Sequence, residues 1–507
     1  MPVTFSSTRG EAKSWGFEEV VLQGLAPDGG LFVPDTIPQM SMKEIEALRG
    51  KPFKDVAYAI IKNYVDEKEI PHADLKKIID KSYASFRDQP GCTPSVKYKD
   101  FWVLELFHGP TFAFKDVALQ LLGNLFEYFL VRGKIQKSVT ILGATSGDTG
   151  SAAIYGLRGK KNVNCFILYP KGKVTDIQER QMTSIPDKNV HCIQVEGDFD
   201  DCQALVKKAF ADKTFKKAVN LGAINSINWA RVMAQITYYF YSWLQITKPK
   251  STDALHFAVP TGNFGDILAG YYAKRMGLPV GKLVIATNSN DVLHRFIETG
   301  KYAKLQCNPT VAPSMDISVS SNFERYLYYL ADCDSTVLAG WFRSFEKGGV
   351  IEVSKAAHAR ARSEFASYSA SKHDMISTMT GMYKEEKYLL CPHTATAAAG
   401  IRALHKKTQE YAHDKTVILA TAHPAKFEEA VNLALGENHG VPRPPELEIL
   451  FTLDRRRSTV SNDVDAVKSM VKRRMIGAGS SILYSINIST VMTIGSLGFM
   501  AYSIFTK

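Results

Sequence analysis

The sequence predicts an α/β protein in which parallel sheets carry helices on both faces. From about residue 100 onward, short apolar runs bounded by glycine alternate with longer amphipathic stretches. Continuous apolar strands are typical of parallel sheets buried on both faces, and their alternation with helices indicates βαβ units. In three places, glycines and small residues stand between such a strand and the next helix. Open parallel sheets bind ligands at these turns, outside the carboxyl ends of the strands.

The individual elements follow from these patterns. In residues 1–95, short strands and helices are punctuated by proline and glycine, and Pro90-Gly91 ends the segment, so we expect a small N-terminal domain there. Beyond it, buried strands are expected at residues 138–142, 163–169, 190–195, 255–259, 284–287 and 417–420. Helices are expected at residues 114–131, 201–211 and 228–244. A chain of 507 residues is long enough for several domains.

Composition excludes several classes of protein. The net charge is +11, but residues 451–507 contribute +5 of it, from eight Lys or Arg and three Asp or Glu, and no nucleic-acid-binding motif is present. The seven cysteines are scattered without a CxxC pair, which argues against a disulfide framework or a structural metal site and favours a reducing compartment. The N-terminus lacks the apolar segment of a secretory signal. We therefore expect a cytoplasmic protein that binds no nucleic acid.

Residues 471–507 form a distinct tail. A basic flank of Lys472, Arg473 and Arg474 precedes a stretch, residues 475–506, without any charged residue. Its most apolar part, residues 482–505, is long enough for a helix that crosses a bilayer, which needs ~20 residues, and a basic flank is typical of the cytoplasmic side. Serines, Asn487 and two glycines dilute this stretch. The pattern indicates either a membrane anchor at 482–505 or a C-terminal extension that packs nowhere in particular.

Two glycine-rich turns have the properties of anion-binding loops. Residues 143–150 (GATSGDTG) and residues 260–266 (PTGNFGD) each follow a predicted strand and precede a predicted helix. Glycines let the backbone approach a ligand, and the N-terminus of the following helix favours a phosphate or carboxylate. Neither loop is a P-loop or a GxGxxG fingerprint. For the first loop, a strand-to-helix turn capped by Ser or Thr remains an alternative.

Lys115 is the candidate nucleophile. It stands at the start of a predicted apolar helix, among Phe112, Ala113, Phe114 and Val117. Desolvation disfavours the ammonium form, lowers the pKa of the amine and makes it a usable nucleophile. The alternative is a solvated lysine at a helix start, which is the common case.

Five motifs occur in a fixed order along the chain: HGPTFAFKD, GATSGDTG, AINSINWAR, PTGNFGD and TAHPAKF. Together with DGGLFVPD at residues 28–35, they closely resemble the threonine synthases of the fungal and enterobacterial branch. The resemblance covers about residues 1–470. It implies a pyridoxal-phosphate enzyme of fold type II, similar to the tryptophan synthase β subunit. Two three-layer α/β/α lobes over residues 96–470 would then follow the N-terminal domain. The implied reaction converts O-phospho-L-homoserine and water to L-threonine and phosphate.

The resemblance also implies roles for individual residues. Lys115 matches the lysine that holds pyridoxal 5'-phosphate as a Schiff base. The loop that grips the cofactor phosphate is matched by Gly262, Asn263, Phe264, Gly265 and Asp266. Thr421 matches the residue that faces the pyridine nitrogen. The candidates for the substrate α-carboxylate are Thr145, Ser146 and Thr149. The candidates for the substrate phosphate are Asn225, Ser226, Asn228 and Arg231.

One position departs from the family pattern, and three other functions stay open. Cys391 stands before Pro392 where we expect an acid, which affects local hydrogen bonding. A serine or threonine dehydratase of the same fold would use the same lysine but would lack a pocket for the substrate phosphate. A nucleotide-binding oxidoreductase would also have glycine-rich turns, but it should show a GxGxxG, which is absent. A membrane-anchored binding protein without catalysis is the alternative from another class.

Overall fold

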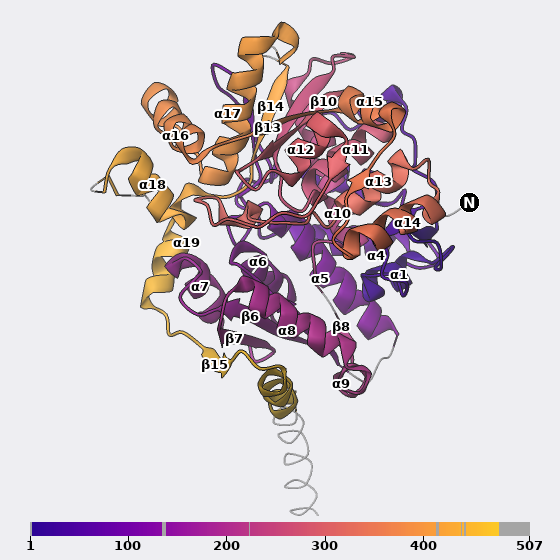
Figure 1. Ribbon diagram of the computed structural model, residues 1–507, viewed down its shortest axis with the longest axis vertical. Coiled ribbons are helices and arrows are strands. Elements are labelled where there is room, and N and C mark those ends of the chain that lie inside the picture. The colour runs from indigo at the N-terminus through magenta and orange to yellow at the C-terminus, as the bar shows by residue number, and fades with distance from the viewer. Residues whose placement is uncertain are drawn as a thin grey trace, which may run out of the picture.

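Two sheets form the frame of the computed structural model, which describes residues 3–133, 138–222, 224–411, 415–437, 439–440 and 443–475. One sheet has five strands, all parallel, in the order β15-β7-β6-β5-β8. The other has six strands in the order β13-β10-β9-β14-β4-β3, parallel except for β3. Figure 1 shows the five-stranded sheet with α6, α7 and α8 in the lower half and the six-stranded sheet in the upper half. The predicted α/β class with parallel sheets is confirmed.

The five-stranded lobe contains three of the predicted strands. Its strands are β5 (Val139–Ala144), β6 (Val163–Pro170), β7 (Val190–Glu196), β8 (Leu221–Gly222) and β15 (Arg457–Ser461). Its helices are α6 (Asp148–Leu157), α7 (Asp176–Thr183), α8 (Phe199–Ala211) and α9 (Lys213–Val219). A helix over residues 464–475 follows β15, and its Val467 and Val471 are buried against this lobe.

The six-stranded lobe contains the other three predicted strands, at residues 255–259, 284–287 and 417–420. Its strands are β3 (Ser95–Lys97), β4 (Trp102–Glu105), β9 (Leu255–Pro260), β10 (Val280–Thr287), β13 (Phe365–Ser369) and β14 (Thr416–Ala420). Its helices are α11 (Gly265–Arg275), α12 (Val292–Thr299), α13 (Phe323–Leu330), α14 (Ser335–Glu346), α15 (Lys355–Glu364), α16 (Lys372–Glu386), α17 (Pro392–Lys407) and α18 (Glu428–Leu435). The short pair β11 (Lys301–Tyr302) and β12 (Ile351–Glu352) lies outside the main sheet. A short helix, α19 (Pro445–Glu448), precedes the return to β15.

Two long helices, α5 (Lys115–Arg132) and α10 (Trp229–Ile246), connect the lobes and the N-terminal elements. The N-terminal elements are β1 (Phe5–Ser7), α1 (Phe17–Gln23), β2 (Phe32–Pro34), α2 (Met42–Glu46), α3 (Phe53–Ile61) and α4 (His72–Tyr83). Their apolar side chains join those of α5 and α10 in one continuous core. The predicted helices at 114–131, 201–211 and 228–244 are therefore confirmed as α5, α8 and α10.

Both faces of each sheet are buried, which explains the continuous apolar strands. In β6, Cys165 and Ile167 face the central core with α5 and α6, whereas Phe166 and Leu168 pack with α8, α9 and the helix at 464–475. The six-stranded sheet alternates in the same way between α10 and α11 on one face and α16 and α17 on the other. Successive side chains of a strand point to opposite faces, so both must be apolar here.

The predicted membrane anchor at residues 482–505 lies outside the described residues. Among the described residues, no helix combines the length and apolar character that a bilayer crossing requires.

A direct backbone contact sets the distance between α5 and α6, the two helices that begin with Lys115 and Asp148. A Cβ on Gly123 would lie 1.9 Å from the carbonyl oxygen of Gly156, and a Cβ on Gly156 would lie 2.4 Å from the carbonyl oxygen of Leu119. Backbone atoms cannot rotate away as a flexible side chain can. The two glycines therefore allow the helices to pack at a separation that no other residue permits.

We predict that Gly123→Ala lowers the free energy of unfolding by about 1–3 kcal/mol because the added methyl overpacks this contact. Urea unfolding followed by circular dichroism measures the effect. The matched control is Gly340→Ala in α14, where the new Cβ would meet only Arg343 Nη2 at 3.8 Å. There the same change should stabilise the helix by about 0.5–1 kcal/mol. Equal effects at the two positions would contradict the contact.

Candidate active site

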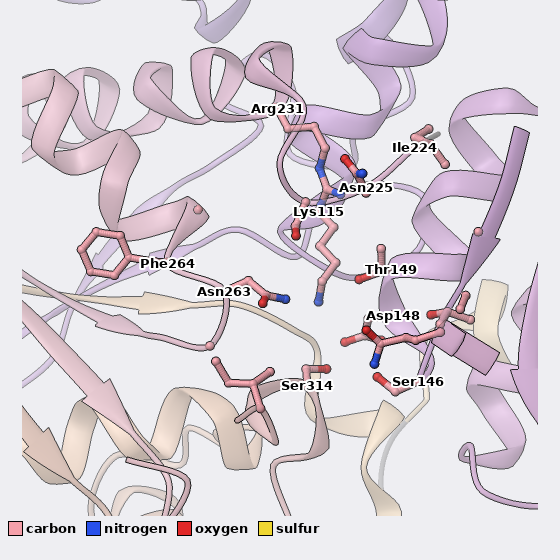
Figure 2. Close-up of a pocket in the computed structure, with 18 of the residues that line it drawn as sticks. Lys115, Ser146, Asp148, Thr149, Ile224, Asn225, Arg231, Asn263, Phe264 and Ser314 are labelled. Atoms are coloured by element: carbon pink, nitrogen blue, oxygen red, sulfur yellow. The ribbon is translucent and has the colours of Figure 1, made fainter. Parts of the chain in front are cut away.

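A cavity of about 730 Å³ opens where strands of both sheets end. It is lined by the segments that follow β5, β9 and β14, by the start of α5 and by the loop at residues 313–317. Figure 2 shows Lys115 reaching into it, with Asn263 on one side and Ser146, Asp148 and Thr149 on the other. All predicted site residues except Asn228 line it. The strand ends thus place the predicted residues together, as the parallel topology requires.

The segment that carries Lys115 is joined to the end of β14 by backbone hydrogen bonds. Phe114 N–H donates to the carbonyl oxygen of Thr421 at 2.8 Å, and His423 N–H donates to that of Phe112 at 3.1 Å. Lys115 is then the first residue of α5, and its side chain is half-buried. Burial lowers the pKa of the Lys115 amine to about 8. The predicted nucleophile is therefore less protonated near neutral pH than an exposed lysine would be.

The loop at residues 262–266 presents unused N–H groups to the cavity. Phe264 adopts a left-handed conformation with φ of +62°, and its ring packs on Phe323 and Phe365, at 5.1 and 5.7 Å between centroids. Figure 2 shows this ring pointing away from Lys115. Among the described residues, none accepts a hydrogen bond from the backbone N–H groups of residues 262–266. The turn and the N-terminus of α11 together form a cradle for an anion.

Asp266 has a different position from the rest of its loop. Its Oδ1 accepts hydrogen bonds from the hydroxyls of Tyr238 at 2.6 Å and Tyr239 at 2.9 Å. Its other oxygen is buried and has no partner among the described residues. Burial raises the pKa of this carboxyl to about 6. The side chain anchors the start of α11 to α10, and the backbone of the loop is the part that can face an anion.

The loop at residues 143–150 divides its hydroxyls between two uses. The Oγ1 of Thr145 accepts from the N–H groups of Gly147 at 3.0 Å and Gly150 at 2.8 Å, so it braces the turn from within. In contrast, the hydroxyls of Ser146 and Thr149 have no hydrogen-bond partner among the described residues and border the cavity. Of the three predicted donors, these two are available to a ligand.

The first turn of α10 carries an unpaired cation, Arg231, just after the loop at residues 225–228. Arg231 is only 5% exposed, lines the cavity, and has no carboxylate partner in the described part of the chain; its Nη1 has no hydrogen-bond partner there. Burial lowers the pKa of its guanidinium to about 10. The buried Oδ1 of Asn225 also lacks a partner there. Figure 2 shows both side chains beside Lys115. An uncompensated buried guanidinium is costly unless a ligand supplies the anion.

Asn228 and Ser226 are used by the protein itself. Asn228 is fully buried; its Oδ1 accepts from Ala230 N–H at 3.0 Å as the N-cap of α10, and its Nδ2 donates to the carbonyl of Val21 at 2.8 Å. The hydroxyl of Ser226 lies 3.2 Å from that of Ser321. Ser226 lines the cavity, whereas Asn228 fixes the start of the helix that carries Arg231.

Thr421 lies at the end of β14 and is 5% exposed. Its N–H donates to the hydroxyl oxygen of Thr394 at 3.2 Å, and that hydroxyl lies 3.1 Å from the sulfur of Cys391. Cys391 is the N-cap of α17, with its sulfur accepting from Thr394 N–H at 3.4 Å. The cysteine thus takes the capping position where the sequence led us to expect an acid. The hydroxyl of Thr421 has no partner among the described residues.

Two features of the site were missed by sequence reasoning. One is a buried ion pair between Asp148, the first residue of α6, and Lys426, which lies in a short 3₁₀ helix, η3 (Pro424–Lys426). The other joins loops: Asn322 Nδ2 donates to the carbonyls of Ser226 at 3.1 Å and Asn263 at 3.0 Å. Asp148 and Lys426 both lie within motifs that the sequence displayed, but a motif does not show which of its side chains pair.

Comparison with known proteins gives one consistent family. The chain matches the family descriptions "Threonine synthase N terminus" over residues 4–83, "Pyridoxal-phosphate dependent enzyme" over residues 87–339 and "Threonine synthase, C-terminal" over residues 394–471. Threonine synthase of Schizosaccharomyces pombe is 51% identical, over 93% of this chain and 98% of the relative. That of Saccharomyces cerevisiae is 46% identical with the same coverage. The crystal structure of pyridoxal-phosphate-bound threonine synthase from Brucella melitensis matches with a TM-score of 0.88 and 42% identity, over 93% of this chain and 99% of that one.

We predict that Asn322→Ala lowers the free energy of unfolding by about 2–3 kcal/mol. The change removes the donor to the carbonyl of Ser226 and the side-chain donor to that of Asn263, which keeps its bond from the backbone N–H of residue 322. It also removes one of the three acceptors of the fully buried Arg325 guanidinium. Thermal or urea unfolding measures the loss. Ser321→Ala is the matched control, because its partly exposed hydroxyl bonds the side chains of the same two loops, at Ser226 and Asn263. Its effect should stay within about 0.5 kcal/mol, and a similar loss in both variants would refute the assignment.

Proposed function

The chain belongs to the threonine synthase family of pyridoxal-phosphate-dependent lyases, and we propose that its cavity converts O-phospho-L-homoserine and water to L-threonine and phosphate. The main observation in support of this proposal is that three groups line one cavity: a desolvated amine, a loop of free N–H groups and an unpaired buried guanidinium. The substrate and the cofactor each bring one phosphate. Two separate anion sites beside one amine match that requirement.

The residues present fit pyridoxal phosphate. The free N–H groups of residues 262–266 at the start of α11 suit its phosphate. We propose that Gly262, Asn263, Gly265 and the backbone of Phe264 form this cradle and that Lys115 holds the aldehyde carbon. Asp266 then faces the phosphate only through its backbone N–H, because its carboxylate bonds the hydroxyls of Tyr238 and Tyr239.

Thr421 is proposed to face the pyridine nitrogen. Its hydroxyl borders the cavity, and its backbone is tied to the segment of Lys115 through the bond from Phe114. A neutral hydroxyl, unlike a carboxylate, carries no negative charge that would stabilise a protonated ring nitrogen, so it would leave that nitrogen largely unprotonated. The carboxylate of Asp148 is paired with Lys426 and is not free to take this role.

The substrate is proposed to bind between two groups of residues. Ser146 and Thr149 offer free hydroxyls at the start of α6, where the helix dipole favours the α-carboxylate. Thr145 supports them by bracing the turn. Arg231, with Asn225 and Ser226, is proposed to bind the substrate phosphate. Asn228 acts on this group indirectly, as the cap of α10.

The protein's part in the chemistry follows from these positions. When bound, pyridoxal phosphate supplies an aldehyde that captures an amine and a ring that withdraws electrons from the substrate Cα. Lys115 would hold the cofactor in the resting protein, and once displaced by the substrate amine its Nζ would be placed to take the Cα proton. A second proton would leave Cβ, and the phosphate would leave from Cγ with its charge stabilised by Arg231. A proton would then be returned to Cγ to form the methyl group, water would add its hydroxyl at Cβ, and a proton returned to Cα would complete threonine.

A serine or threonine dehydratase of the same fold is the second candidate by chemistry. Its substrates carry no phosphate, so a buried guanidinium facing the substrate would stay uncompensated. Arg231 therefore favours the phosphate ester.

We also propose a reducing compartment such as the cytoplasm, because all seven cysteines are free and five of them are buried.

We predict that the purified protein releases phosphate from O-phosphohomoserine and forms threonine in equal amounts, with at most slow turnover of serine or threonine. Lys115→Ala should abolish the absorption of the lysine-linked cofactor and the turnover, since the covalent link and the base are lost together. Lys115→Ala protein that still binds the cofactor but lacks this absorption band would agree with a phosphate cradle at residues 262–266. Ammonia release from threonine as the dominant reaction would overturn the proposal.

We predict that Arg231→Gln lowers kcat/KM for O-phosphohomoserine by about 100-fold, ~3 kcal/mol, because a buried charge contact to the phosphate is lost. The same variant should unfold at an equal or higher temperature than wild type, because it removes an uncompensated buried charge. Arg180→Gln is the matched control, since this guanidinium is paired with Asp176 at 2.8 Å on α7. It should leave kcat/KM within a few-fold; a reversed pattern would exclude a phosphate site at Arg231.

A further inference from the structure

The ammonium group of Lys426 is completely enclosed. Its side chain is 0% exposed, and Nζ lies 2.6 Å from Asp148 Oδ1 and donates to the carbonyl oxygen of Thr111 at 2.8 Å. Gln178 and Gln181, both from α7, donate to the same two acceptors at 2.9 and 3.0 Å. A buried ion pair gives little net stability after its desolvation. Because the pair between Lys426 and Asp148 lies at the active site, we expect a role in the reaction rather than in stability.

Lys426 joins three of the ordered sequence motifs. It lies in TAHPAKF, its carboxylate partner Asp148 lies in GATSGDTG, and its carbonyl partner Thr111 lies in HGPTFAFKD. Thr111 in turn donates to the buried carboxylate of Asp116 from its N–H at 2.8 Å and from its hydroxyl at 2.7 Å. Lys115 lies between Thr111 and Asp116 in this segment. One ammonium group thus fixes the loop of the nucleophile against the loop proposed for the substrate carboxylate.

The pair also lies beside the nucleophile. Figure 2 shows Asp148 close to the end of Lys115. An ionised carboxylate at this position stabilises the ammonium form of Lys115, whereas the ammonium of Lys426 destabilises it. Without Lys426, Asp148 would have Lys115 as its remaining cationic neighbour and would hold it protonated. The geometry thus places two opposite influences on one amine.

We propose that Lys426 is a positioning residue that binds Asp148 and so prevents this carboxylate from capturing Lys115 as a salt-bridged ammonium. Asp148 and Lys426 together then leave the amine free for its link to the cofactor and for proton transfer. This inference rests on the proposed function of Lys115. Neither Asp148 nor Lys426 takes a proton in the reaction.

The other groups around Lys115 are accounted for. Although burial opposes ionisation of Asp148, the ammonium groups of Lys426 and Lys115 hold the pKa of Asp148 well below its usual range, so it stays ionised. On α5, Asp116 favours the ammonium of Lys115, and on α10, Arg231 disfavours it. On α11, Asp266 faces Lys115 with its pKa raised to about 6 by burial. On α17, burial lowers the pKa of His393 to about 3, so this ring is neutral.

The proposal predicts opposite effects from the two halves of the pair. Lys426→Met leaves Asp148 free for Lys115 and should raise the pH at which the Lys115 nitrogen loses its proton by about one unit. Asp148→Asn removes the attractive charge and should lower that pH by a similar amount. The double variant removes both influences and should titrate between the two single variants. A role limited to packing would not give shifts of opposite sign.

The test is a spectrophotometric pH titration of the full chain loaded with pyridoxal phosphate, which follows the proton on the lysine-linked nitrogen without reference to turnover. Lys160→Met is the matched control, since this lysine is also largely buried and lies near a carboxylate, Glu127 at 3.6 Å, away from the cavity. It should titrate as wild type. For a variant that binds the cofactor too weakly, labelling of Lys115 with an amine reagent at graded pH gives the same comparison.

The outcomes separate the two proposals. Opposite shifts in Lys426→Met and Asp148→Asn, with the double variant between them, support the role of the pair. Shifts in the same direction, or no shift beyond that of Lys160→Met, overturn it while the function of Lys115 stands. A wild-type protein without a lysine-linked absorption band would instead overturn the proposed function itself.

Discussion

A buried guanidinium without an anion is the constraint around which this active site is built. Arg231 is 5% exposed and has no carboxylate partner in the described ranges. An isolated protein gains nothing from such a charge, because desolvation is not repaid by any contact within the chain. The desolvation free energy of this guanidinium is offset only when a ligand brings negative charge into the cavity. The same holds for the free N–H groups of residues 262–266, so the site is electrostatically incomplete by itself.

An incomplete site has to be kept open by the surrounding structure, and here the supports are backbone contacts. The glycine contact between α5 and α6 fixes the distance between the helices that begin with Lys115 and Asp148. Asn322 holds the carbonyls of Ser226 and Asn263, and the buried Arg325 beside it donates to the carbonyl of Phe32 in β2 at 2.8 Å. The two anion loops therefore share one support with the N-terminal strand. This explains why the N-terminal elements pack into the same core as α5 and α10.

The sequence predicted the central strands and helices and the loops that form the site, because these elements follow from local patterns. Short apolar runs bounded by turn residues, such as 163–169, favour strands covered on both faces, and glycine turns that follow parallel strands meet at the same edge of a sheet. The edge strands β13 and β15 were missed because their polar sequences, FASYS and RSTVS, lack that pattern. Side-chain pairing was not predictable either. Asn228 looked like a ligand donor but caps α10, and the partner of Asp148 lies far away in the chain.

The charge balance also explains why a cysteine can stand at the start of α17. Burial raises the pKa of the Cys391 thiol, so the cap is neutral, and it reaches Thr421 through the hydroxyl of Thr394. Asp148 also raises that pKa, which places the thiol within the electrostatic range of the pair with Lys426. A carboxylate at this position would cap the helix more strongly. It would also add a negative charge within electrostatic range of Asp148 and compete for the ammonium of Lys426 that pairs with it. A thiol keeps the cap and leaves Lys426 to Asp148, so a cysteine where we expected an acid is consistent with the balance of charge around Lys115.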